Sequence, residues 1–297
     1  MTKDQNGEDG NRELYPSDLD DAAWEVIEAV LPVRDRSRGG APMKYAMREV
    51  INTIFYVKRT GIQWRATPHD LVPWWVGYRW FRTFAGDGTW DRLTDELCRQ
   101  VRVSEGRDPQ PSAGVLDAQS IKTSEGGEER GFDNGKKVTG RKRHLLVDVL
   151  GLPLLILVTA ASVSDRTAAR KMLPAAMRKF PGLGLVWVDG GYVNKVDQSL
   201  VPWADDQLRL KVVVVKRSDD VKGFQVLPRR WVVERSNAWM VAQRRLARDY
   251  ERLTVTAEAM IKVCFIDLMA RRLARQRRNG TTVTASAPAT ETTARAA

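Results

Sequence analysis

Three acidic residues stand in segments where a carboxylate needs a partner. Asp117 interrupts an otherwise apolar run typical of a β-strand, and Asp189 ends a second apolar run just before Gly190–Gly191. Glu234 lies in a segment with helical periodicity. A carboxylate on a strand loses solvation, so a cation or a bound metal must stabilise it. Two Asp from two strands and a Glu from a helix beside the same sheet can therefore converge on a hard divalent cation, which prefers oxygen ligands.

Each acid also has a plainer interpretation, and for single residues these alternatives stay open. Asp189 followed by glycine is typical of a turn. Asp117 can cap the turn after its strand, and Glu234 can form an i, i+4 ion pair with Arg230. Together, however, the three acids indicate a site for two divalent ions. Two ions about 3.5 to 4 Å apart can activate water or a 3′-hydroxyl and stabilise the leaving oxygen of a phosphodiester.

Other catalytic chemistries lack support in the sequence. Neither His69 nor His144 stands in a signature of nucleophilic catalysis. The chain contains no P-loop motif and no dinucleotide-binding glycine motif, so we expect no nucleotide cofactor. Cys98 and Cys264 lie far apart, which argues against a disulfide framework and against a thiolate zinc site.

The charge of the chain indicates a polyanionic partner. Its formal net charge is +11 and its pI about 9.8, although residues 1–30 are acidic. A positive field of this kind attracts nucleic acid and makes its binding dependent on salt. The alternative is a basic protein that uses arginine for surface ion pairs. Because the longest apolar stretch, 150–163, is interrupted and short, and the N-terminus is polar, we expect a cytoplasmic protein without a membrane span.

The first hundred residues are predicted to be helical. Ser17 is a good N-cap for a helix that ends before Pro32, and a second helix over 47–60 ends at Gly61. Two further helices, 74–85 and 89–101, are separated by a glycine turn.

From residue 114 onward the pattern alternates between strands and helices. Apolar and β-branched runs predict strands, and 3.6-residue periodicity with capping signals predicts helices. The expected strands are 114–123, two runs within 144–162 that turn near Leu150–Gly151, 183–191 and 210–217, and the expected helices are 166–180 capped by Asp165, about 195–207, 229–250 and 255–278. This order is typical of an α/β domain with a mixed sheet covered by helices.

Five segments carry a resemblance to a known family. They are LDAQSIKT at 116–123, GKKVTGRKRHLLVD at 135–148, VWVDGGY at 186–192, LPRRWVVERSNAW at 227–239 and RRLARDYERL at 244–253. In these segments, and in INTIFYVKRTGIQWRATP at 51–68, the chain resembles the DDE transposases of the insertion sequence five family, bacterial enzymes with a ribonuclease H-like core. The resemblance runs from about Tyr15 to Arg272.

The resemblance implies a role for each acid. Asp117 and Asp189 match the two family aspartates and Glu234 matches the family glutamate. They would hold two Mg²⁺ ions, with Mn²⁺ as an alternative, for cleavage of element ends and attack of the 3′-hydroxyl on target DNA. The short interval between Asp189 and Glu234 leaves no room for a large insertion domain.

Several basic residues are predicted to contact DNA. Residues 135–144 are predicted to form a mobile basic loop on phosphates, and its cations are Lys136, Lys137, Arg141, Lys142 and Arg143. Arg230 and Glu234 reproduce the Arg-x-x-x-Glu part of a transposase signature, whereas Leu227 and Val241 replace its Tyr and Lys. Arg244 and Arg245 could supply phosphate contacts instead. The alternative for all these cations is a solvated charge.

The expected organisation has four parts: a disordered acidic N-terminus (1–14), a helical DNA-binding domain (15–105), a ribonuclease H-like catalytic domain (112–278) and a disordered tail (279–297). Tryptophans 64, 74, 75 and 80 are expected in the helical core rather than on bases. The expected partners are the double-stranded inverted repeats, the target DNA and a second copy of the chain. The alternatives are a nuclease without strand transfer, a domesticated DNA-binding protein and a nonspecific basic protein.

Overall fold

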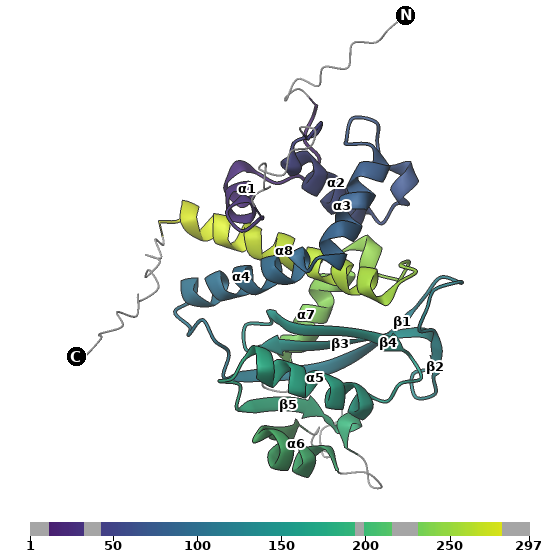
Figure 1. Cartoon of the computed structure of the whole chain (residues 1–297), viewed down its shortest axis with the longest axis vertical. Helices are drawn as coiled ribbons and strands as arrows, with labels where there is room; N and C mark the ends of the chain where they lie inside the picture. The colour runs from purple at the N-terminus through teal and green to yellow at the C-terminus, as the bar shows by residue number, and fades with distance from the viewer. Residues whose placement is uncertain (1–11, 33–42, 194–198, 216–230, 281–297) are drawn as a thin grey trace, which may run out of the picture.

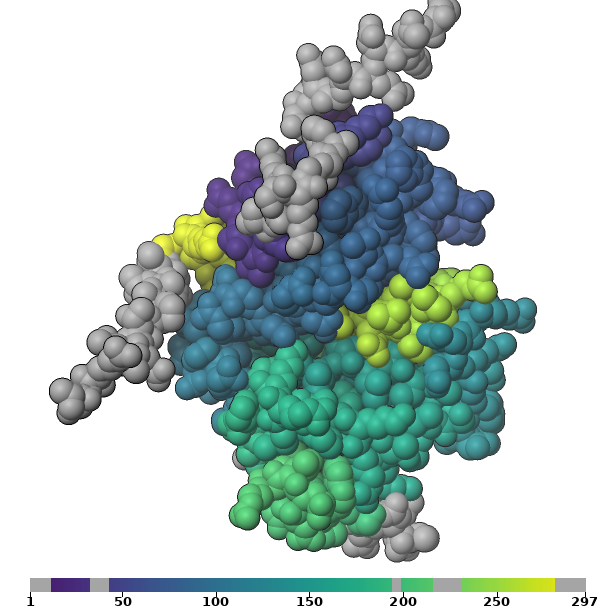
Figure 2. Space-filling model, viewed as in Figure 1, coloured from purple at the N-terminus to yellow at the C-terminus, as the bar shows by residue number. Residues whose placement is uncertain are grey.

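The computed structural model describes residues 12–32, 43–193, 199–215 and 231–280. A group of helices lies on one side of the molecule and a mixed β-sheet with its own helices on the other (Figure 1). In the space-filling view the helical part lies above the sheet part, and the two are in contact across the middle of the molecule (Figure 2). Among the described residues, no helix is both long enough and apolar enough to cross a membrane.

The helical part follows the capping signals of the sequence. Asp20, rather than Ser17, caps the first helix by accepting a hydrogen bond from the Ala23 N–H, and Gly61 ends the second at φ 74°. The elements are α1 (Asp21–Glu28), α2 (Met47–Thr60), the short η1 (Trp64–Ala66), α3 (Trp74–Gly86) and α4 (Thr89–Ser104). The four helices predicted here are all present among the described residues.

The helix α8 (Thr254–Arg278) packs against the N-terminal helices α1 to α4 and against strand β4 of the sheet (Figure 1). Its apolar side chains belong to the same hydrophobic core as those of α1, α2 and α4. Buried Lys58 of α2 forms an ion pair with Asp267 of α8, and Lys262 Nζ lies 2.6 Å from Asp91 Oδ1 of α4. The sequence assigned this helix to the catalytic domain, and its packing joins the helical part to the sheet.

The sheet has the strand order β2-β3-β1-β5-β6, with β4 paired to β3. The strands of the described region are β1 (Ala113–Lys122), β2 (Gly131–Asp133), β3 (Val138–Asp148), β4 (Pro153–Ala160), β5 (Leu185–Asp189) and β6 (Lys211–Val215). Pairs of β3 with β1, β2 and β4 are antiparallel, whereas β5 is parallel to both β1 and β6. The predicted mixed sheet flanked by helices is confirmed.

Helices cover both faces of this sheet. Leu116, Leu146 and Val188 pack in one cluster with the helices α5 (Asp165–Lys179) and α6 (Leu200–Leu208). The alternate residues Val115 and Trp187 pack in the other cluster, which includes α7 (Trp231–Val241). Side chains alternate between faces along a strand, so each residue's position in the strand determines which helices it meets.

Two predicted elements differ from the structure. Residues 138–144 of the predicted basic loop belong to β3, which leaves only a short turn at 134–137. The predicted helix over 229–250 ends at Val241 and is followed by the short η3 (Arg244–Leu246). Beyond the end of this helix, Arg245 is buried and its guanidinium pairs with the Glu251 carboxylate.

Candidate active site

Asp117 and Asp189 lie on neighbouring parallel strands. In the register of β1 and β5, Val115 faces Trp187 and Leu116 faces Val188, so the next row brings Asp117 beside Asp189. Val115 and Trp187 pack on the α7 side of the sheet, and residues two positions further point the same way. Both aspartates are half-buried. Two neighbouring carboxylates on one face of the sheet offer the oxygen ligands that a divalent ion prefers.

Helix α7 crosses the same face and contacts one of these acids. Asn237 Nδ2 donates a hydrogen bond to Asp117 Oδ2 at 3.1 Å. Glu234 lies one turn earlier on the helix and is exposed to solvent. Within the described parts of the chain, no group of three or more acidic, histidine or cysteine side chains is gathered closely enough to hold a metal ion. The structure therefore brings Asp117 and Asp189 together and places Glu234 on the adjoining helix.

The turn at 134–137 lies next to Asp117. Lys136 Nζ donates a hydrogen bond to the Ala118 carbonyl at 2.9 Å, and Lys137 is exposed. Asp133 holds the turn by accepting from the Gly135 N–H at 2.9 Å and the Lys136 N–H at 3.1 Å. Burial opposes ionisation of Asp133, but hydrogen bonds from Ser120 and the backbone outweigh it and lower its pKa to about 2.

The other three cations of the predicted basic loop are buried, so the prediction that they form an exposed surface is wrong. Arg141 is fully buried and donates to the carbonyls of Glu128, Glu251 and Arg252. Lys142 Nζ lies 3.0 Å from Asp165 Oδ1. Arg143 Nη1 donates to the Leu246 carbonyl at 2.7 Å, and burial lowers the pKa of its guanidinium. These side chains hold β3 to segments that follow it in the chain.

The two arginines that follow α7 also differ in burial. Arg244 is exposed, whereas Arg245 is buried and donates to Glu251 Oε1 at 2.7 Å. Arg230 lies outside the described residues. Of the predicted core tryptophans, Trp64 packs on Tyr78 and Phe81, but Trp75 is half exposed.

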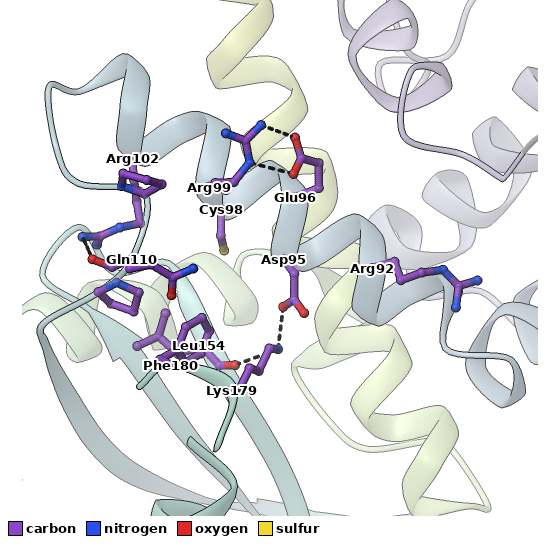
Figure 3. A pocket seen from close by; sticks show the side chains of 12 residues that line it. Arg92, Asp95, Glu96, Cys98, Arg99, Arg102, Gln110, Leu154, Lys179 and Phe180 are labelled. Carbon is purple, nitrogen blue, oxygen red and sulfur yellow. Dashed lines mark hydrogen bonds and ion pairs between the residues drawn. The ribbon is translucent and has the colours of Figure 1, made fainter. Parts of the chain in front are cut away.

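A pocket between α4 and the sheet lies apart from these residues (Figure 3). It has a volume of about 340 Å³, and none of the side chains predicted to do chemistry lines it. Its charged groups are already engaged, since Arg99 donates to Glu96 and Lys179 Nζ lies 2.5 Å from Asp95 Oδ1. The paired aspartates therefore remain the centre of the candidate site.

Sequence reasoning missed Asn237. The signal available was its spacing, three residues after Glu234, which places both on one helix face. An amide, unlike an acid, did not draw attention as a metal ligand.

Comparisons with known proteins agree with this arrangement. The family model described as "Transposase DDE domain" matches residues 108–268, and that described as "Putative transposase of IS4/5 family" matches residues 19–94. The "Putative transposase for insertion sequence element IS402" of Burkholderia cepacia is 32% identical over 131 residues, which are 42% of this chain and 60% of that protein.

A second relative from the same organism is the "Insertion element IS402 uncharacterized 16.2 kDa protein". It is 30% identical over 122 residues, which are 38% of this chain and 78% of that protein. The DDE-domain model matches the sheet with the two aspartates, and the IS4/5-family model matches the helical part. The chain thus belongs to the DDE transposases of the IS4/5 family.

Proposed function

We propose that this transposase binds the terminal inverted repeats of an insertion sequence, cleaves the DNA strands at the element ends and joins the resulting 3′-hydroxyl to target DNA. The observation that carries the proposal is the placement of Asp117 beside Asp189 under the helix that bears Glu234. These oxygen donors suit Mg²⁺, and Mn²⁺ as an alternative.

Each acid has a distinct part in this proposal. Asp117 and Asp189 bind divalent ions from the sheet, and Glu234 completes the second site from α7. Bound ions would supply Lewis acidity toward the attacking and leaving oxygens of the phosphodiester. In this proposal the exposed Glu234 side chain reaches the ions from a helix that Asn237 joins to Asp117 of β1.

The DNA backbone follows exposed cations of the catalytic part. Those proposed for phosphate contacts are Lys136 and Lys137, in the turn beside Asp117, and Arg244, beyond α7. A dimer is expected in the DNA complex because two element ends must be paired for transposition.

The test is cleavage of a labelled duplex that carries the element's own end, in Mg²⁺ and in EDTA. Wild type should cleave only with Mg²⁺, whereas Asp117→Asn, Asp189→Asn and Glu234→Gln should bind the duplex normally without cutting it. Asp205→Asn, an exposed aspartate on α6, is the matched control and should cleave like wild type.

Each other outcome would indicate a different function of the protein. Cleavage retained by one of the three acid variants would remove that acid from the mechanism. Cleavage without joining to a target duplex would indicate a nuclease that lacks strand transfer. End binding by a wild type that never cleaves would indicate a domesticated DNA-binding protein, and binding without preference for the end would indicate a nonspecific one.

A further inference from the structure

The hydrogen bond between Asn237 and Asp117 joins two elements that are 120 positions apart in the chain. Both side chains are half-buried, so the contact lies under α7 and is partly shielded from solvent. Asn237 offers an amide, which is neutral at every accessible pH and donates through Nδ2. A hydrogen bond to the charged form of a carboxylate favours that form and restricts its rotation.

Adjacent residues of α7 fix where Asn237 stands. Arg235 Nη2 donates to the Leu150 carbonyl at 2.8 Å, and Ser236 Oγ donates to the Gly151 carbonyl at 2.8 Å. Both acceptors lie in the turn between β3 and β4. Three consecutive residues thus bind α7 to the sheet, two of them to a turn and the third to an acid of the candidate site.

The same contact contributes to the position of Glu234. Residues three apart lie on one face of a helix. The orientation of α7 that brings Asn237 onto Asp117 therefore turns Glu234 toward the same face of the sheet. Without the contact, α7 would still be held by the hydrogen bonds of Arg235 and Ser236 and by apolar packing, but its direct link to an acid of the candidate site would be lost.

We propose that Asn237 is a positioning residue that orients the Asp117 carboxylate toward the metal ions and, together with Arg235 and Ser236, holds the helix that carries Glu234. This inference rests on the proposed function. Partners that hydrogen-bond to a metal-binding carboxylate keep it in one orientation, and their loss typically lowers metal affinity or activity about 10- to 100-fold. Asn237 acts through Asp117 and contacts no substrate in this proposal.

The test measures Mn²⁺ binding by electron paramagnetic resonance of the full-length protein in the absence of DNA. Asn237→Ala should weaken Mn²⁺ binding about 10-fold. Asn237→Gln retains the amide on a longer side chain and should recover part of the loss. Val241→Ala, at the exposed end of α7, is the matched control and should bind Mn²⁺ like wild type.

A second comparison separates positioning from a loss of folding. If Asn237 acts through Asp117, then adding Asn237→Ala to the Asp117→Asn variant should cause no further weakening of Mn²⁺ binding. Thermal unfolding in EDTA reports whether each variant is folded.

The outcomes distinguish this inference from the proposed function. Equal Mn²⁺ binding by wild type and a folded Asn237→Ala variant would overturn the positioning role while leaving the metal site in place. Additive losses in the double variant would also overturn it. A folded wild type that binds no Mn²⁺ would contradict the proposed function, and the positioning role would fall with it.

Discussion

Arg141 Nη1 lies 3.1 Å from Asp249 Oδ2, and both side chains are buried between β3 and the segment that precedes α8. The same guanidinium donates to three backbone carbonyls, so its five N–H groups are largely satisfied within the protein. A cation that a charge pattern assigns to DNA is thus part of the folded interior.

Replacement of Arg141 should therefore act on stability. Arg141→Ala leaves Asp249 buried without its partner and removes three backbone contacts, so it should lower the free energy of unfolding by about 3 to 5 kcal/mol. Urea denaturation followed by tryptophan fluorescence measures this. The exposed Lys137→Ala variant is the control, with a change within about 0.5 kcal/mol. A stable Arg141→Ala protein with weakened DNA binding would contradict the structural role.

The exposed cations should act on DNA affinity instead. Each phosphate contact that is lost reduces the slope of log affinity against log salt by about 0.9. Lys137→Ala and Arg244→Ala should each lower the slope by about that amount, measured by fluorescence anisotropy over a series of salt concentrations. Arg107→Ala, an exposed arginine before the opposite end of β1, is the control, and a slope that falls equally there would argue against a defined phosphate path.

His144 predicts a pH dependence of stability. Burial, and then the charges of Lys142 and Lys136, lower its pKa from 6.5 to about 3. The folded protein therefore binds fewer protons than the unfolded chain between these values, and stability is lost as the pH falls from 6.5 toward 3.

The expected slope for this one group approaches 1.4 kcal/mol per pH unit. His144→Gln can keep a hydrogen bond to Thr159 and should remove this contribution, whereas His69→Gln, at an exposed position, should keep the wild-type slope. Urea denaturation at pH 7, 6 and 5 provides the comparison. Parallel pH profiles of wild type and His144→Gln would show that burial of the imidazole costs less than expected.

Two glycines of the same segment should differ in their tolerance of alanine. A Cβ at Gly140 would stand 2.0 Å from the Ile121 carbonyl oxygen of the paired strand, whereas at Gly135 the nearest atom is 3.4 Å away. Gly140→Ala must push β1 and β3 apart and should cost about 3 kcal/mol, as overpacking of a rigid site does. Gly135→Ala should change little. Thermal unfolding measures both, and equal stabilities would show that the strand pair yields easily.

Much of the sheet could be predicted because its signals are local. Apolar runs defined β1 and β5, and Asp117 within β1 and Asp189 at the end of β5 share a face through the two-residue alternation of strands. The helix that bears Glu234 was visible from its periodicity, but its end was not. Arg245 lies beyond the end of the helix and pairs with Glu251, and the periodicity of the sequence does not reveal this ion pair.

The buried cations could not be assigned from the sequence because their partners lie far along the chain. Arg141 meets Asp249 across more than a hundred residues, and a run of basic side chains looks the same whether water or carbonyl groups surround it. Asn237 was missed for a related reason, since an amide shows its role only when the acid that it contacts is known.

The packing of α8 against α1 to α4 affects how the chain folds as it is synthesised. Residues 21–104 leave the ribosome first, yet the apolar surface that covers them is carried by residues 254–278. The core of the helical part therefore stays incomplete until the strands and then α8 have been synthesised. Contacts that span so much of the chain slow folding and prolong the exposure of apolar surface. A newly made transposase is for this reason expected to depend on chaperones and to become competent for DNA only after release.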